Sequence, residues 1–237
     1  MRMKTVRRHS SSVGAQLLCV VALAAALTGC DRAVSGVAVR DPNTPAGKIL
    51  EKSALDDVLL SVDELDDILG TSTLDIKLDE KKLLDQSDAM ADPSCAASAF
   101  GGQEELFGDS GYTGVRHQVF RESGAGSGYL AEQIVVSYPS GDDAKTLLEK
   151  AKTTWQDCAG TMTTYGSSGA VDWSVDDVES DDSSISQFST LPDVSGGCSH
   201  SMDVSANVVV ETWVCGPDSN GEALTIAKDI VKKVEEA

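Results

Sequence analysis

The side chains best suited to chemistry in this sequence are few and far apart. Beyond residue 29 there are two histidines, His117 and His200, and either could serve as a general base. The sequence contains no Gly-x-Ser-x-Gly, no His-Glu-x-x-His and no glycine-rich phosphate loop, and an EF-hand starting at Asp172 lacks the central glycine and the final glutamate. Strand histidines beside aromatic residues are usually packing residues, so we expect no catalytic residue, no metal and no cofactor.

A binding cleft is the more plausible source of function. Arg116 and Gln118 share the polar-bearing face of the strand "VRHQVF", and an arginine offers a fork of donors to a carboxylate or phosphate. Trp155 and Trp213 could supply apolar walls. The alternatives are a structural ion pair for Arg116 and core positions for both tryptophans. We therefore take these four residues as candidates for lining a ligand-binding cleft.

The N-terminus has the pattern of a lipoprotein leader. Four basic residues precede an apolar run, Leu17 to Leu27, that is too short for the roughly 20 residues a spanning helix needs. The run ends in "LTGC", a lipobox, which predicts cleavage after residue 29 and lipid attachment at Cys30. Acyl chains on Cys30 would anchor the protein to the outer face of the cell membrane. The alternative is an ordinary secretory leader with an incidental cysteine.

The remaining chain is strongly acidic. The first 29 residues hold four of the 19 basic residues and none of the 38 acidic ones, so residues 30–237 carry 15 basic and 38 acidic residues, a net charge of −23. Such a chain will not seek nucleic acid or anionic lipid through general electrostatics. Residues 30–56, rich in proline, glycine and small residues without a period, are expected to form a flexible tether reaching roughly 30 Å.

Three segments have the apolar spacing of amphipathic helices. The first follows Ser61, with Glu64 at capping-box spacing and Gly70 at its end. The second is capped by Ser140 and Asp143, and its apolar residues form a stripe on one face that ends at Cys158. The third begins with Ser219 and Glu222, which have capping-box spacing. Segments 112–121 and 129–138 alternate as strands, with a loose connection between them. Helices with antiparallel strands and no βαβ rhythm predict an α+β domain.

Four cysteines remain beyond Cys30, and in an exported chain an even number predicts two disulfides. If residues 198–215 form a hairpin with a two-residue loop at Ala206-Asn207, partner numbers sum to 413 and Cys198 lies opposite Cys215. Directly opposed residues are close to disulfide distance. The remaining pair is then Cys95 with Cys158. A zinc site is the rival, but no pair has Cys-x-x-Cys spacing.

The order of these segments resembles a known family. "LLSVDELDDILG", "GYTGVRHQVFRE", "TWQDCAG", "NVVVETWVCG" and "ALTIAKDIVKKV" are similar to the extracellular sensor domain of the mycobacterial receptor Ser/Thr kinase PknH, a domain that actinobacterial lipoproteins also carry. The resemblance covers residues 57–237. It implies an antiparallel sheet, of about five to six strands, with helices packed against it, one cleft and two disulfides.

Two functional classes follow. The preferred one is a lipid-anchored extracytoplasmic sensor that captures a small envelope ligand. The alternative is a protein-interaction lipoprotein that docks an envelope partner through its acidic surface. A hydrolase using His117 or His200 is a weaker third.

Overall fold

Nine strands form one antiparallel sheet, with the order β1-β2-β3-β9-β8-β7-β5-β4 and β6 paired to β7. The computed structural model describes residues 48–124, 128–191, 196–217 and 219–237. The expected leader, Cys30 and most of the expected tether lie outside these residues. The strands are β1 (Leu74–Glu80), β2 (Gly114–Glu122), β3 (Leu130–Ser137), β4 (Gly160–Gly166), β5 (Gly169–Val175), β6 (Glu179–Ser180), β7 (Ser184–Thr190), β8 (Gly197–Ser205) and β9 (Val208–Gly216).

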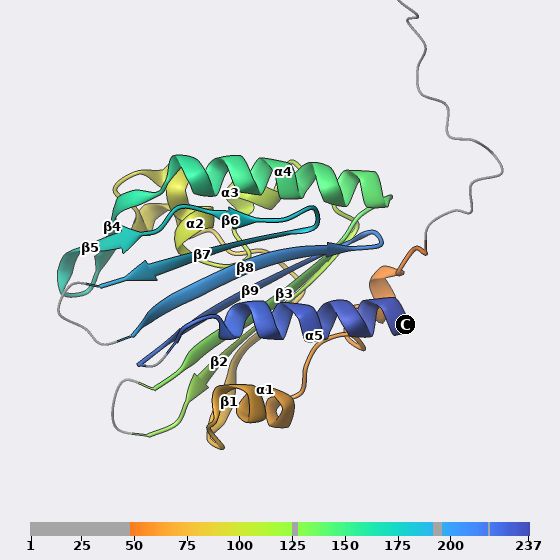
Figure 1. The fold of residues 1–237 in the computed structure, drawn as a ribbon, viewed down its shortest axis with the longest axis horizontal. Helices are drawn as coiled ribbons and strands as arrows, with labels where there is room; N and C mark the ends of the chain where they lie inside the picture. The colour runs from red at the N-terminus through yellow and green to blue at the C-terminus, as the bar shows by residue number, and fades with distance from the viewer. Residues whose placement is uncertain (1–47, 125–127, 192–195, 218) are drawn as a thin grey trace, which may run out of the picture. The chain divides into compact units, whose positions relative to one another are not determined.

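Helices cover both faces of this sheet. They are α1 (Val62–Leu69), α2 (Ala96–Ala99), α3 (Glu104–Phe107), α4 (Gly141–Asp157) and α5 (Glu222–Glu236), with single 3₁₀ turns at Lys52–Ala54, Ser87–Ala89 and Pro93–Cys95. Figure 1 shows α4, α2 and α3 along one side of the sheet and α5 and α1 along the other. The α5 side buries one apolar core and the α4 side another. The α+β prediction is confirmed, and both faces of the central strands are buried.

The helix boundaries follow the local sequence. Ser61 and Glu64 form the expected reciprocal capping box of α1, and Gly70 ends the helix with φ 65°. Ser140 accepts a hydrogen bond from the Asp143 amide at the start of α4, whose apolar stripe is buried. The expected capping box of the third helix is wrong: the N-cap of α5 is Gly221. The buried Ser219 hydroxyl contacts Glu222 Oε2 at 3.2 Å and Val214 O at 3.1 Å, but it does not cap the helix backbone.

The late hairpin has the predicted register. Cys198 pairs with Cys215, His200 with Trp213 and Met202 with Glu211, around a turn in which Ala206 has φ 53°. Both cysteine pairs, Cys95 with Cys158 and Cys198 with Cys215, are joined as expected.

Two expectations need correction. The sheet has nine strands rather than five to six, because β1 and the β4–β7 region also pair. The folded domain also begins before residue 57: Leu50 and Leu55, within the segment expected as a tether, are 6% and 1% exposed. The Asn207 side chain holds this segment, because Oδ1 accepts from Leu50 N at 2.7 Å and Nδ2 donates to Leu50 O at 3.1 Å. The composition of the segment gives no sign of these contacts, because they join residues 157 positions apart in the sequence.

Candidate functional site

The sheet face beneath α4 changes from apolar to polar along the central strands. Cross-strand pairing defines four successive rows over β2, β3, β9 and β8. They are Val115-Val136-Val209-Val204, His117-Ile134-Glu211-Met202, Val119-Glu132-Trp213-His200 and Arg121-Leu130-Cys215-Cys198. The first row belongs to the apolar core, and the middle rows hold two histidines and two glutamates. The last row reaches the open end of the face.

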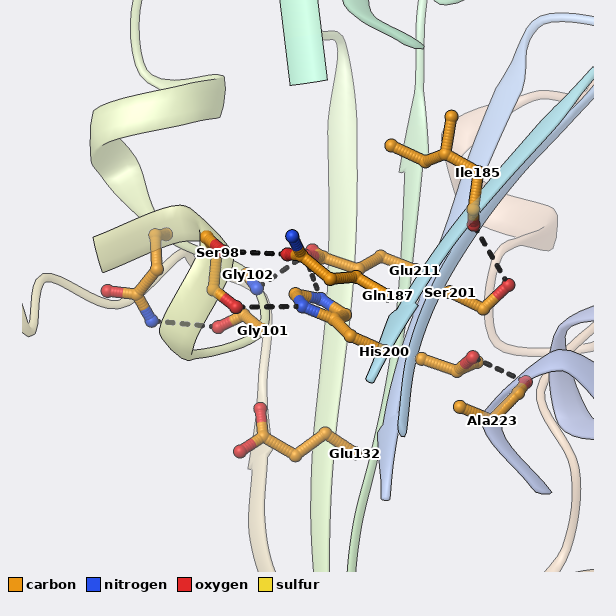
Figure 2. A network of polar contacts seen from close by, with 12 residues as sticks. Ser98, Gly101, Gly102, Glu132, Ile185, Gln187, His200, Ser201, Glu211 and Ala223 are labelled. Carbon is orange, nitrogen blue, oxygen red and sulfur yellow. Dashed lines mark hydrogen bonds and ion pairs between the residues drawn. The ribbon is translucent and has the colours of Figure 1, made fainter. Parts of the chain in front are cut away.

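His200 and Glu211 form a buried pair at the centre of this face. His200 Nε2 lies 2.8 Å from Glu211 Oε1, and the two side chains are 3% and 1% exposed. Glu211 Oε2 accepts the backbone N–H of Gly102 at 2.8 Å, and His200 Nδ1 lies 3.3 Å from Ser98 O (Figure 2). Both ring nitrogens of His200 thus face oxygen atoms.

His117 and Glu132 form a second pair. Their Nε2 and Oε2 atoms are 2.9 Å apart, with side-chain exposures of 0% and 8%. His117 Nδ1 has no hydrogen-bond partner in the described part of the chain. The backbone of residues 101–102 lies close above both groups: a Cβ at Gly101 would come 2.9 Å from Glu132 Oε2, and one at Gly102, where φ is +64°, would come 2.7 Å from His117 Nδ1. Glycine is required here by close approach and, at Gly102, by backbone conformation.

The segment that covers the two pairs is fixed at several points. The Cys95–Cys158 disulfide ties its start to the end of α4. Ser98 Oγ donates to Gln187 Oε1 at 2.8 Å, and Gln187 Nε2 donates to Trp155 O and Asp176 O. Gln103 Nε2 donates to Gly101 O at 2.8 Å. Both His–Glu pairs are thus buried beneath this segment, with side-chain exposures of 8% or less.

A hollow opens where the last row of the face ends. Its volume is about 380 Å³, and Trp213, Trp173, Leu130, Arg121 and the Cys198–Cys215 disulfide are in its lining. It exists because β5 pairs with β7 only through Ser174–Thr190 and Val175–Ser189, so that the β4–β5 hairpin leaves the sheet near Trp173. Its volume lies in the range of small-molecule sites, about 300–1,000 Å³.

Trp213 connects this hollow to the buried pairs. It is the cross-strand partner of Glu132 on one side and of His200 on the other. Its ring meets that of Phe100 edge-on, with centroids 6.5 Å apart. A molecule in the hollow would therefore lie one row, or two residues along the strands, from the row that holds Glu132 and His200.

The four residues predicted to line one cleft do not come together. Arg116 lies on the opposite face, 8% exposed, where its guanidinium pairs with Asp56 and Asp79 and donates to Glu80 O at 3.1 Å. Burial opposes ionisation of Asp56, but the hydrogen bond and charge of Arg116 hold the pKa of that carboxyl below its usual value. Arg116 thus ties the segment before α1 to the sheet, which is the structural alternative considered for it.

The other three candidates divide between core and hollow. Gln118 Oε1 accepts from Gln133 Nε2 at 2.9 Å, on the same face as Arg116. Trp155 is 0% exposed on the buried side of α4. Trp213 alone among the four lines the hollow.

Sequence reasoning found the histidines but not their glutamates. The hairpin register that it derived already places Met202 opposite Glu211 and His200 opposite Trp213, which makes His200 and Glu211 diagonal neighbours. Glu132 has the same relation to His117 across β2 and β3. Diagonal positions on one sheet face lie within reach of long side chains, so the register contained the signal.

One further buried acid lies on the α5 side. Asp203 is 7% exposed, and its Oδ2 has no hydrogen-bond partner in the described part of the chain. Burial, with a contribution from Asp181, raises the pKa of Asp203 from 3.8 to about 6.

Two further properties bear on function within residues 48–124, 128–191, 196–217 and 219–237. No three His, Cys, Asp or Glu side chains gather there as metal ligands would. None of the helices in that part of the chain combines the length and apolarity needed to cross a bilayer.

Comparison with known proteins gives a consistent result. The model of the PknH-like extracellular domain matches residues 50–233. The chain is 25% identical over 200 residues to the serine/threonine-protein kinase PknH of Mycobacterium tuberculosis (strain ATCC 25618 / H37Rv), and 26% identical over 195 residues to that of Mycobacterium bovis. These matches cover 84% and 81% of this chain but only 32% and 33% of the kinases, so the chain spans about a third of their length.

A solved structure shares the fold. The crystal structure of the extracellular domain of PknH from Mycobacterium tuberculosis superposes with a TM-score of 0.75 at 24% sequence identity. The match covers 81% of this chain and all of that one.

Proposed function

Because this chain belongs to the family of PknH-like extracellular domains, we propose that it is a lipid-anchored extracytoplasmic sensor that binds a small ligand of the cell envelope and catalyses no reaction. Anchoring rests on the lipobox that ends at Cys30, and the extracytoplasmic location agrees with the two disulfides. The hollow beside Trp213 is the ligand site.

The observation that carries the proposal is the position of Trp213 between the hollow and the two buried His–Glu pairs. A ligand that moved this indole would disturb groups whose hydrogen bonds depend on the backbone of residues 98–102. Because hydrogen bonds in a buried network are sensitive to small displacements, ligand binding would change how this segment packs. The burial of both histidines supports the expectation that neither acts as a catalytic base.

Anchoring is tested on the full chain produced in an actinobacterial host. Membrane fractionation and intact mass should show a protein that begins at Cys30 and carries acyl chains. Cys30→Ser should abolish the acyl mass and release the protein from the membrane. Cys19→Ser, inside the expected leader, is the matched control and should change neither. An unmodified, uncleaved N-terminus in the wild-type protein would refute this part.

Ligand binding is tested by native mass spectrometry after the same protein has been exposed to envelope extract. We expect a retained small mass that Trp213→Leu loses while the circular dichroism spectrum is kept. If no small mass is retained and one protein instead co-purifies with salt-sensitive affinity, the acidic docking alternative is right and the sensor proposal is wrong.

A further inference from the structure

We infer that the hollow takes an amphiphilic anion, with the acidic group at Arg121 and the apolar part between Trp173 and Trp213. This inference rests on the proposed function, because it names the ligand class of that same site. Its evidence is the chemistry of the lining, in which apolar and aromatic surface predominates and one guanidinium is present. The apolar members are Tyr129, Leu130, Trp173, Leu191, Trp213 and Pro217.

The apolar part of the lining comes from the central strands and from the β4–β5 hairpin. Trp213 and Leu130 project from the sheet, while Trp173 projects from the hairpin that leaves it. Trp173 is fixed by its own ring nitrogen, since Nε1 donates to Thr164 Oγ1 at 3.0 Å. Two indoles with settled orientations form walls for an aliphatic or aromatic group, and burying such a group contributes roughly 25 cal/mol per Å².

Arg121 is placed to receive an anion. It follows Val119 on β2 and pairs with Leu130, so it shares the face of Trp213 at the mouth of the hollow. Its side chain is exposed, and among the described residues no carboxylate pairs with its guanidinium. Arg116, five positions earlier on the same strand, is by contrast committed to two aspartates on the other face. Asp75, the cross-strand partner of Arg121 on β1, instead binds Lys77 Nζ at 3.2 Å and accepts from the Ser123 hydroxyl. Arg121 thus keeps its donor fork for a carboxylate or phosphate.

Glu122 also borders the hollow, but its charge is already engaged. Its carboxylate accepts from the Thr71 hydroxyl at 2.7 Å and from Tyr129 N at 3.1 Å, and these hydrogen bonds lower the pKa of Glu122. Strand alternation directs it to the face opposite Arg121. A cationic ligand head group would therefore meet the Arg121 guanidinium first, which disfavours it. A ligand without charge would leave that guanidinium without a partner.

The test compares ligands that share one chain and differ in charge. Dodecanoate, dodecyl phosphate, dodecyl maltoside and dodecyltrimethylammonium are titrated below their micelle concentrations into residues 30–237, with tryptophan fluorescence and calorimetry as readouts. We expect at least one anion to bind about tenfold or more tightly than the neutral and cationic probes, as a charge-assisted hydrogen bond predicts. The carboxylate and phosphate arms decide which acid the site prefers.

Variants locate the binding site. Arg121→Glu should lower the affinity for the two anions by about tenfold or more, so that they no longer bind more tightly than the cation. Lys145→Glu makes the same charge change on the exposed side of α4 and should leave affinity within about twofold. Trp173→Phe should diminish the fluorescence response, while Trp155, which is fully buried, keeps its emission. Arg121→Gln, a milder change, replaces Arg121→Glu if the latter does not fold.

Three results would overturn the inference: equal affinity for all four probes, binding of none, or equal effects of Arg121→Glu and Lys145→Glu. Retention of an envelope ligand by native mass spectrometry distinguishes failure of the ligand class from failure of the sensor proposal. If the domain retains such a ligand but binds neither dodecyl anion, the ligand class is wrong and the sensor proposal stands. If it retains none and binds none, both fail.

Discussion

The indole of Trp155 lies over the imidazole of His200, with ring centroids 3.9 Å apart and planes inclined by 32°. The contact joins α4 to β8 and fixes the histidine on a third side, besides Glu211 and the Ser98 carbonyl. His117 is less constrained, since its one hydrogen bond within the described residues goes to Glu132. The two pairs therefore offer a direct comparison of buried His–Glu chemistry in one domain.

For the His117–Glu132 pair, removal of either partner should cost more than removal of both. Glu132→Met should lower the free energy of unfolding by about 3–5 kcal/mol, because it leaves a buried imidazole without its partner. His117→Leu should cost a similar amount, while the double variant should recover part of the loss. Urea unfolding of the four proteins measures the coupling. Additive single costs would show that the two side chains do not act as a pair.

Asp203 should make the domain less stable as pH rises. Its pKa is about 6 in the fold and 3.8 ordinarily, so its stabilising contribution is complete below about pH 4 and is lost as pH rises through 6. Asp203→Asn should therefore raise the free energy of unfolding at pH 8 by about 1–3 kcal/mol and by less at pH 5.

Urea unfolding at pH 5, 6, 7 and 8 measures this difference. Glu64 does not interfere in this pH range. Its pKa is about 2 in the fold and 4.5 ordinarily, so its contribution to stability is lost only as pH falls below about 4.5. A difference between Asp203→Asn and wild type that is constant from pH 5 to pH 8 would contradict the prediction.

The two disulfides should contribute unequally. The Cys95–Cys158 bond closes a loop with a sequence separation of 63, and the Cys198–Cys215 bond one of 17. The chain-entropy relation then gives about 4 and about 3 kcal/mol, so the double alanine variant of the first pair should have the lower urea midpoint. A lower midpoint for the second variant would indicate that the bond at the hollow has a role beyond loop closure.

Replacing Arg116 should lower the free energy of unfolding, whereas replacing Arg121 should not. Arg116→Met leaves two aspartates and the Glu80 carbonyl without their shared donor, and should cost about 1–3 kcal/mol. Arg116→Lys should restore only part, because an ammonium lacks the planar fork. Arg121→Met, on the same strand but exposed, is the control and should change stability by less than about 0.5 kcal/mol. Equal costs at the two positions would remove the distinction between a structural and a free arginine.

The helices and the late hairpin could be predicted because their signals are local. Apolar spacing and a Ser–Glu pair determine where α1 begins, and a two-residue turn sets the register that joins Cys198 to Cys215. The strands β4, β5 and β7 could not be found this way. β4 and β7 consist largely of Thr, Ser and Gly, and β4 and β5 are mostly exposed. Only the short run from Val171 to Val175 in β5 alternates, so little signal for a strand prediction is present.

The site was harder to predict than the fold because it depends on which face each strand presents. Arg116 and Arg121 are both basic residues of β2, and only the pairing of the whole sheet shows that one is enclosed by aspartates and the other lies beside Trp213. The contribution of Trp173 depends on where β5 separates from β7, which has no counterpart in the local sequence. These are properties of long-range geometry.

The attachment of Leu50 to Asn207 decides how the domain meets its surroundings. Asn207 immediately precedes β9, whereas the lining of the hollow lies around Cys215 at the far end of that strand, roughly 25 Å away at about 3.3 Å per residue. The segment at Leu50 thus lies at one end of β9, and the residues that line the hollow lie at the other. Figure 1 shows β9 running along the sheet beside α5. The described segment around Leu50 therefore lies away from the mouth of the hollow, so that a ligand entering the proposed site does not displace it.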